Sequence, residues 1–236
     1  MNLLAELLRG LPWPDWLALV LLFAGWVGYA TFARRRAAVQ PSLLALTNRE
    51  RRRWMDQAAV RENRVVDGVV VQNLSTSPSF FASTTILILG GLLASIFAGD
   101  QASEFVREIP FAARTSVLVF ELKLVLLTAV FTFAFFRFTW SMRQYSFGAI
   151  LVAAAPDRDE FAADPARRDA FAERAGRVMG MAAETFNDGL RAYYMAFAVC
   201  AWFFSPWAFM AATATVIFIL YRREFHSDVV AVLREG

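Results

Sequence analysis

Two charged residues interrupt an apolar stretch, and their chemistry needs an explanation. Glu121 and Lys123 lie within the run Leu118–Leu124, and Lys123 is the only lysine of the 236-residue chain. Charges inside a bilayer are costly unless they are paired, hydrated or functional. Residues two positions apart point to opposite sides of a helix, so we do not expect these two to pair within one helix. Three alternatives stay open: a shallow pair that snorkels to the headgroups, a functional polar path, and a pair between neighbouring subunits.

A second polar group, rich in hydroxyls, precedes and opens another apolar stretch. With Glu121 and Lys123 it forms the candidate intramembrane polar site, whose hydroxyl residues are Ser75, Thr76, Ser77, Ser79, Ser83, Thr84 and Thr85. Such side chains can line an aqueous vestibule or bind dehydrated ions, as in channels. They can also join helices by hydrogen bonds where small residues allow close approach. The sequence leaves both roles open.

Catalytic and cofactor motifs are missing from the sequence. It contains no P-loop, GxGxxG, HExxH, GxSxG or CxxC pattern. Its single cysteine, Cys200, excludes a disulfide scaffold, and its single histidine, His226, excludes sites that need two histidines from one chain. We therefore expect that the protein is not an enzyme and that it binds no cofactor and no metal.

The elements that carry these residues are expected to be membrane-spanning helices. Hydrophobic residues make up 58% of the chain, whereas a soluble domain has about 45–50%. A span needs about 20 apolar residues, and the expected spans are residues 16–33, 79–98, 116–136, 189–204 and 207–221. The last two divide one apolar stretch at Ser205-Pro206, because proline removes a helix donor. We predict an all-α polytopic membrane protein with a single membrane domain over residues 1–236.

Arginine placement predicts the orientation of these spans. Of the 23 arginines, 20 fall in segments that a five-span topology places on one side of the membrane, and only Arg9, Arg107 and Arg114 fall on the other. We expect a protein of the bacterial inner membrane with a periplasmic N-terminus and a cytoplasmic C-terminus. A four-span topology would move the three arginines of the C-terminal tail to the outside.

Two polar regions are expected in the cytoplasm. Residues 42–76 predict an amphipathic helix that begins at a capping box of Thr47 and Glu50. Residues 137–187 predict a long antiparallel helical hairpin that extends spans three and four, interrupted at Pro156-Asp157 and resumed at Pro165 with Asp164 as its cap. The amphipathic helix carries a basic cluster that we expect to face lipid: Arg49, Arg51, Arg52 and Arg53.

The hydroxyl-rich segment also carries a family resemblance. The pattern Arg61…Asp67-Gly68…Asn73-Leu74…Ser77-Pro78-Ser79-Phe80-Phe81-Ala82-Ser83-Thr84-Thr85…Gly90-Gly91 resembles an uncharacterised membrane family of bacteria and plants, domain of unknown function 599. Tyr145-Ser146-Phe147 and the segment 221–225 are similar to it as well. The resemblance covers about residues 45–230. It implies a multi-span membrane protein and supplies no activity.

We expect an oligomeric inner-membrane protein that conducts or transports a small ion or solute. The alternative is a non-catalytic accessory or scaffold subunit of a larger membrane complex. The expected partners are the lipid bilayer and further copies of the chain, without nucleic acid. The two functions predict different surroundings for Glu121 and Lys123. A transport protein would turn them toward a cavity or an oligomer axis, whereas a scaffold would bury them in a packed contact.

Overall fold

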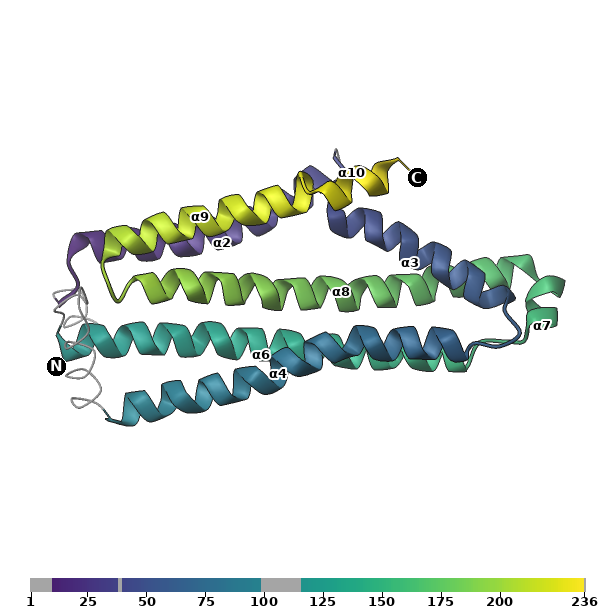
Figure 1. Cartoon of the computed structure of the whole chain (residues 1–236), viewed down its shortest axis with the longest axis horizontal. Coiled ribbons are helices and arrows are strands. Elements are labelled where there is room, and N and C mark those ends of the chain that lie inside the picture. The colour runs from purple at the N-terminus through teal and green to yellow at the C-terminus, as the bar shows by residue number, and fades with distance from the viewer. Residues whose placement is uncertain (1–9, 38–39, 99–115, 236) are drawn as a thin grey trace. The chain divides into compact units, whose positions relative to one another are not determined.

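The computed structural model describes residues 10–37, 40–98 and 116–235, and all regular elements in these ranges are α-helices (Figure 1). The prediction of an all-α fold is confirmed for them, while Arg9, Arg107 and Arg114 lie outside the described ranges. The helices are α2 (Trp13–Ala37), α3 (Leu43–Val60), α4 (Val65–Ala98), α6 (Val117–Ala153), α7 (Arg158–Ala163), α8 (Pro165–Ala201), α9 (Pro206–Phe225) and α10 (Asp228–Arg234).

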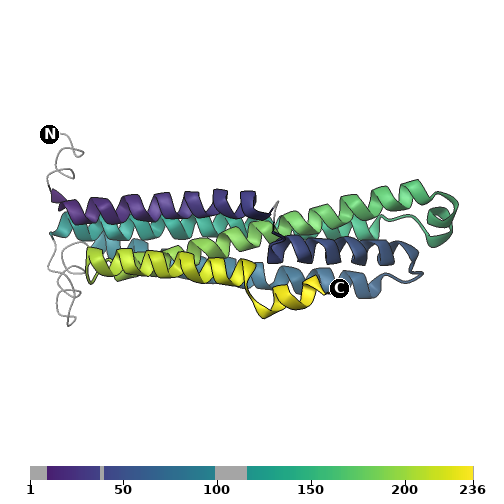
Figure 2. The same ribbon diagram turned by 90° about the horizontal axis from the view of Figure 1, so that it is seen from above.

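The chain divides into two compact units, which we describe separately. Unit 1 comprises residues 1–35, 84–134 and 190–222, and unit 2 comprises residues 36–83, 135–189 and 223–236. Helices α2 and α9 lie side by side in unit 1 (Figures 1 and 2). A Cβ atom added to Gly25 would come within 2.6 Å of the Ile217 side chain, so glycine permits this close packing.

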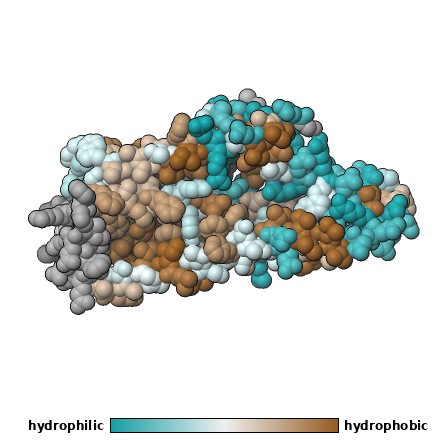
Figure 3. Space-filling model, viewed as in Figure 1, coloured by the Kyte–Doolittle hydropathy of each residue, from teal (hydrophilic) through white to brown (hydrophobic). Residues whose placement is uncertain are grey.

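Apolar side chains occupy both the interior and the surface of unit 1. Inside, the Trp202 indole is fully buried and stacks on Phe209 with ring centroids 5.3 Å apart. Outside, Leu87 and Phe97 remain 77% and 86% exposed. In the view of Figure 3, by contrast, most hydrophilic residues lie on unit 2. A surface this apolar is typical of helices that face lipid.

Three described helices are long and apolar enough to cross a membrane: residues 13–33 of α2, α4 and α6. They agree with the first three expected spans. The expected spans at residues 189–204 and 207–221 belong to α8 and α9, which are long enough to cross a membrane but less apolar over the length of a span. The count of five spans therefore stays a prediction.

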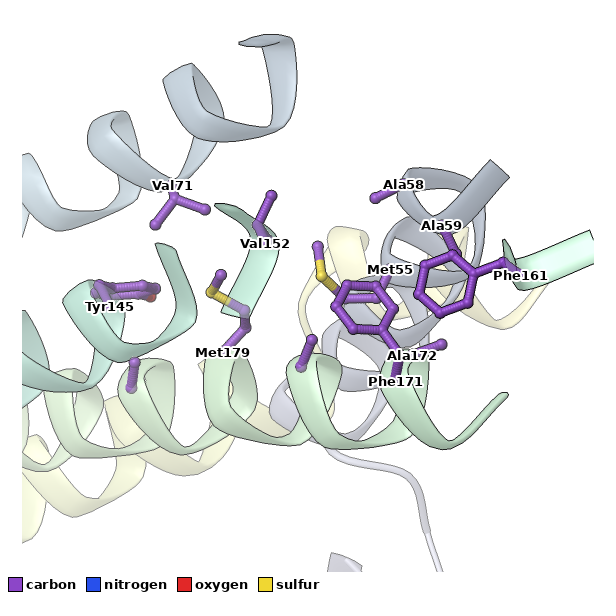
Figure 4. Packing of buried hydrophobic residues seen from close by; sticks show 12 residues of the cluster. Met55, Ala58, Ala59, Val71, Tyr145, Val152, Phe161, Phe171, Ala172 and Met179 are labelled. Carbon is purple, nitrogen blue, oxygen red and sulfur yellow. The ribbon is translucent and has the colours of Figure 1, made fainter. Parts of the chain in front are cut away.

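The parts of α6 and α8 in unit 2 run antiparallel. Ser141 Oγ donates to the Ala182 carbonyl at 2.8 Å, and Gly148 lies against Met179. From the first contact to the second, the residue number increases on α6 and decreases on α8, so the two helices run in opposite directions. Around this pair, α3, α4 and α7 complete a core that includes Met55, Tyr145 and Phe161 (Figure 4).

The expected helix boundaries around the proline residues are confirmed. Helix α6 ends at Ala153, just before Pro156, and α8 begins at Pro165. Asp164 Oδ1 accepts from the Arg167 backbone N–H at 3.0 Å, which is the expected cap. Helix α8 ends at Ala201 and α9 begins at Pro206, so the apolar stretch is interrupted where proline predicted.

The prediction of a capping box at Thr47 and Glu50 is wrong. Ser42 is the N-cap of α3, and its Oγ accepts from the Ala45 backbone N–H at 3.3 Å. Thr47 lies inside the helix, where its hydroxyl donates to the Leu43 carbonyl at 3.0 Å. The physical reason is that a hydroxyl can bond to a carbonyl four residues earlier as readily as it caps.

The prediction of one amphipathic helix over residues 42–76 is also wrong. Helix α3 ends at Val60, and α4 begins at Val65 and continues without interruption to Ala98. The Arg64 guanidinium stabilises the corner, because it donates to the carbonyls of Ala58, Ala59, Ala155 and Pro156. Helix ends leave carbonyls without partners, and one arginine here satisfies two at the end of α3 and two in the loop that follows α6.

Candidate functional site

Lys123 of α6 is buried against the C-terminal end of α8. Its side chain is 1% exposed, and Nζ donates to the Trp202 carbonyl at 2.9 Å. The ammonium also lies 5.4 Å from the Trp202 ring centroid and 5.6 Å from that of Phe203. A helix C-terminus carries partial negative charge and free carbonyls. This end of α8 therefore solvates the ammonium in place of water.

A buried acid completes this cluster through the same tryptophan. Asp15 is 5% exposed, and its Oδ1 accepts from Trp202 Nε1 at 2.5 Å. Trp202 thus connects a buried cation and a buried anion, one through its carbonyl and the other through its indole N–H. We call Asp15, Lys123 and Trp202 the buried polar triad.

Sequence reasoning missed the triad because it considered Asp15 only as an acid at the end of a span. The positions of the three residues relative to the ends of their helices could have indicated the contact. Asp15 lies near the start of α2, Trp202 follows the end of α8, and Lys123 is only six residues from the start of α6. An up-and-down arrangement brings such alternating ends together.

Glu121 has different surroundings. It is half-buried, and no hydrogen bond or ion pair joins its carboxylate to any residue that the structure describes. No ion pair joins it to Lys123 within the described part of the chain, as the opposite directions of the two side chains predict. The structure therefore brings Lys123 together with Asp15 and Trp202 and leaves Glu121 apart.

Part of the hydroxyl cluster lines a pocket in unit 2. The pocket has a volume of about 420 Å³ and lies between α4 and α6. Helix α4 contributes an amide, three hydroxyls and an aromatic ring at helical spacing, and α6 contributes a thioether and a hydroxyl. From α4 these are Gln72, Ser75, Thr76, Ser79 and Phe80, and from α6 they are Met142 and Ser146. We call this the hydroxyl pocket. Its lining is uncharged and could bind a neutral polar molecule or a partly hydrated ion.

The other members of the hydroxyl cluster lie elsewhere. Ser77 and Ser83 are exposed and do not line the pocket. Thr85 is fully buried in unit 1, and its hydroxyl lies 2.6 Å from the Tyr193 hydroxyl of α8. That contact is an interhelical hydrogen bond, whereas the hydroxyls of Ser75 and Thr76 bond to the Gln72 carbonyl of their own helix.

The four arginines of α3 do not form one cluster. Arg51 donates to Thr47 and Asn48, and burial lowers the pKa of its guanidinium, with electrostatic interaction from Tyr145 opposing the shift. Arg52 pairs with Glu173 at 2.5 Å. Arg49 and Arg53 line a separate cleft. That these arginines face lipid stays a prediction.

Within the described residues, no group of three or more His, Cys, Asp or Glu side chains could hold a metal ion. The triad carries one carboxylate and the hydroxyl pocket carries none, so neither resembles a metal centre. What the two sites offer is a buried charge pair and an uncharged polar cavity.

These features define an all-helical protein with several apolar helices of membrane-spanning length. The chain belongs to the family of proteins of unknown function DUF599, whose family model matches residues 17–229. The expected family is thereby confirmed over most of the chain. No curated protein and no solved structure shows a significant match.

Proposed function

We propose that the protein is a non-catalytic accessory or scaffold subunit of a larger complex in the bacterial inner membrane. In this proposal the chain crosses the membrane five times, with a periplasmic N-terminus and a cytoplasmic C-terminus, and further copies assemble with it. The observation that carries the proposal is the burial of Lys123. Lys123, one of the two charges that a transport path could use, is 1% exposed and bonded to a main-chain carbonyl.

The energetics of the triad support this choice. A buried ammonium without a partner is strongly unfavourable, and partners in the same chain offset that cost only when they are well placed and hydrogen-bonded. Trp202 is fully buried and held by Phe209 on its ring face. A residue in these surroundings fixes helix ends rather than meeting a passing ion.

The test is reconstitution of the purified protein in liposomes that carry gradients of K⁺, Cl⁻ or protons. We expect fluxes equal to those of protein-free liposomes, and a complex larger than the homo-oligomer when the chain is purified from its own membranes in mild detergent. A flux that Lys123→Met abolishes, with folding intact, would overturn the proposal.

The second candidate is conduction or transport of a small ion or solute, and the hydroxyl pocket is the observation that favours it. The hydroxyl and amide oxygens of its lining can replace part of a hydration shell. In this case a Ser75→Ala, Thr76→Ala, Ser79→Ala variant should lose flux without losing thermal stability. Ser77→Ala is the matched control, because Ser77 is exposed on the same helix and does not line the pocket.

A further inference from the structure

We propose that a cleft between α3 and α10 in unit 2 binds a phosphate group, carried either by a lipid head or by a soluble compound. The cleft has a volume of about 260 Å³. Residues of α3, the loop before it and α10 line the cleft: Pro41, Leu46, Arg49, Glu50, Arg53 and Leu233, with Arg234 at the C-terminal side. Figures 1 and 2 show α10 beside the start of α3.

The sequence builds one wall of this cleft from a single face of α3. Leu46, Arg49, Glu50 and Arg53 are spaced three and four residues apart, so their side chains lie on the same side of the helix. Helix α10 packs on α3, and its Val230 is 1% exposed. This packing brings the second wall, with its own arginine, against the first.

A hydrogen bond fixes Arg234, on the α10 side of the cleft, to the loop before α3. Arg234 Nη2 donates to the Pro41 carbonyl at 3.3 Å, next to Ser42, the N-cap of α3. The bond uses one nitrogen of the guanidinium and a neutral acceptor. The positive charge of Arg234 therefore stays available to a ligand while its position is fixed.

The cleft carries more positive than negative charge. Its lining contains three guanidinium groups and one carboxylate. That carboxylate, Glu50, accepts from Arg53 at 2.7 Å. No hydrogen bond or ion pair joins Arg49 to another residue in the described ranges. Like charges in a small volume repel one another, and a bound anion would remove that repulsion.

The residue types indicate phosphate. Guanidinium groups match the oxygens of a phosphate with parallel N–H···O bonds, and several of them can surround one anion. Leu46 and Leu233 add an apolar edge to the cleft, and Val229 and Val232 of α10 are exposed close by in the sequence. Such an edge fits a phosphate that is attached to a carbon chain.

Neighbouring arginines of α3 differ from Arg49 in their partners. Arg52 has Glu173 as its partner, and Arg51 donates to side chains of its own helix. Both lie on the same short stretch as Arg49 and Arg53. The charge of Arg52 is thus paired with an acid, whereas those of Arg49 and Arg234 are not paired with an acid in the described residues.

The experiment measures binding to the full chain with two probes. One is inorganic phosphate, added to the chain in detergent and followed by thermal stabilisation. The other is phosphatidylglycerol, supplied in detergent-free vesicles that hold the reconstituted chain and compared with vesicles of neutral lipid alone. Arg49→Gln and Arg234→Gln should each weaken binding of the effective probe roughly tenfold, because each removes a charge-assisted contact. Glu50→Gln should strengthen binding, because it removes the one competing carboxylate.

Arg167→Gln is the matched control. It removes an exposed arginine with an acidic partner, Glu160, outside the cleft. We expect its affinity to equal that of the parent chain. Stabilisation by phosphate alone identifies a soluble ligand, and binding only to phosphatidylglycerol vesicles identifies a lipid head. The proposal is overturned if neither probe binds, if the cleft variants bind like the parent, or if Arg167→Gln weakens binding equally.

Discussion

Lys123 shows how a long apolar helix can keep a buried lysine. The cation lies where α8 ends, and the free carbonyl of Trp202 accepts from it. Asp15 balances the charge from the other side of the same tryptophan. Three residues that are far apart in the sequence therefore depend on one another, and each is buried. The role that follows is to join the ends of three helices within unit 1.

Replacing Lys123 tests this role. Lys123→Met should lower the free energy of unfolding by about 1–3 kcal/mol, because it leaves the Trp202 carbonyl and the Asp15 carboxylate without the cation. Thermal unfolding in detergent measures the change. Glu121→Gln should be close to neutral, since no described residue bonds to that carboxylate.

A double variant separates this account from a pair between subunits. If Lys123 met Glu121 of a second copy, replacing both by apolar residues would restore the stability lost in Lys123→Met. We expect Lys123→Met with Glu121→Leu to remain as unstable as the single variant. Restoration in the double variant would contradict the buried polar triad.

At the scale of elements, single residues decide where helices end and how closely they approach. Arg64 donates to carbonyls of α3 and to those that follow α6. Lysine cannot reproduce this set, because a single ammonium lacks the fork of a guanidinium. Arg64→Lys should lower stability by about 1.5–3 kcal/mol. The control, Arg158→Lys, changes an exposed pair with Glu62 and should shift stability by less than about 0.5 kcal/mol.

Two glycines give opposite predictions for the same substitution. A Cβ atom at Gly189 would come within 2.5 Å of the buried Phe138 ring, whereas one at Gly68 meets nothing within 4 Å. Gly189→Ala should therefore destabilise the protein by about 1–3 kcal/mol through overpacking. Gly68→Ala should stabilise it by up to about 1 kcal/mol through reduced freedom of the unfolded chain. Thermal unfolding of the two variants checks both signs, and equal shifts would contradict the packing.

The sequence predicted those helix boundaries that local chemistry sets. Proline limits a helix whatever its tertiary contacts, so Pro156 and Pro206 mark helix boundaries in the sequence itself. Asp164 likewise caps α8 with its own side chain. The boundary between α3 and α4 has a weaker local signal, because residues 61–64 contain neither glycine nor proline. Asn63 Oδ1 accepts from the Val65 backbone N–H at 2.9 Å, and Arg64 adds bonds to carbonyls 91 and 92 positions later.

The candidate site was predictable to a similar extent. Its residue types could be found from the sequence, since a lysine in an apolar run and a dense set of hydroxyls are unusual. Their partners could not, because burial and register decide which hydroxyl bonds to Tyr193 and which lines a pocket. Thr84 and Thr85 are adjacent, yet Thr85 is fully buried and Thr84 is not.

At the scale of the whole molecule, topologies with three and with five membrane spans predict different positions for one turn. Three helices satisfy the length and apolarity of a span, and the proposed topology adds the ends of α8 and α9. Starting from a periplasmic N-terminus, three and five crossings both leave the C-terminus in the cytoplasm. The side on which the C-terminal tail lies therefore does not distinguish three spans from five. The side on which the turn between α8 and α9 lies does distinguish them.

Cysteine labelling at that turn gives the decisive prediction. Cys200 is the only native cysteine, so Cys200→Ala provides a background without thiols. Phe204 is 51% exposed and lies in the turn before Pro206. With five spans, Phe204→Cys reacts with a membrane-impermeant thiol reagent on intact cells, because the turn reaches the periplasm. With three spans it reacts only after the inner membrane is permeabilised. Glu235→Cys is the control, which should be protected in intact cells in both cases, and its labelling from outside would reverse the orientation that the arginines predict.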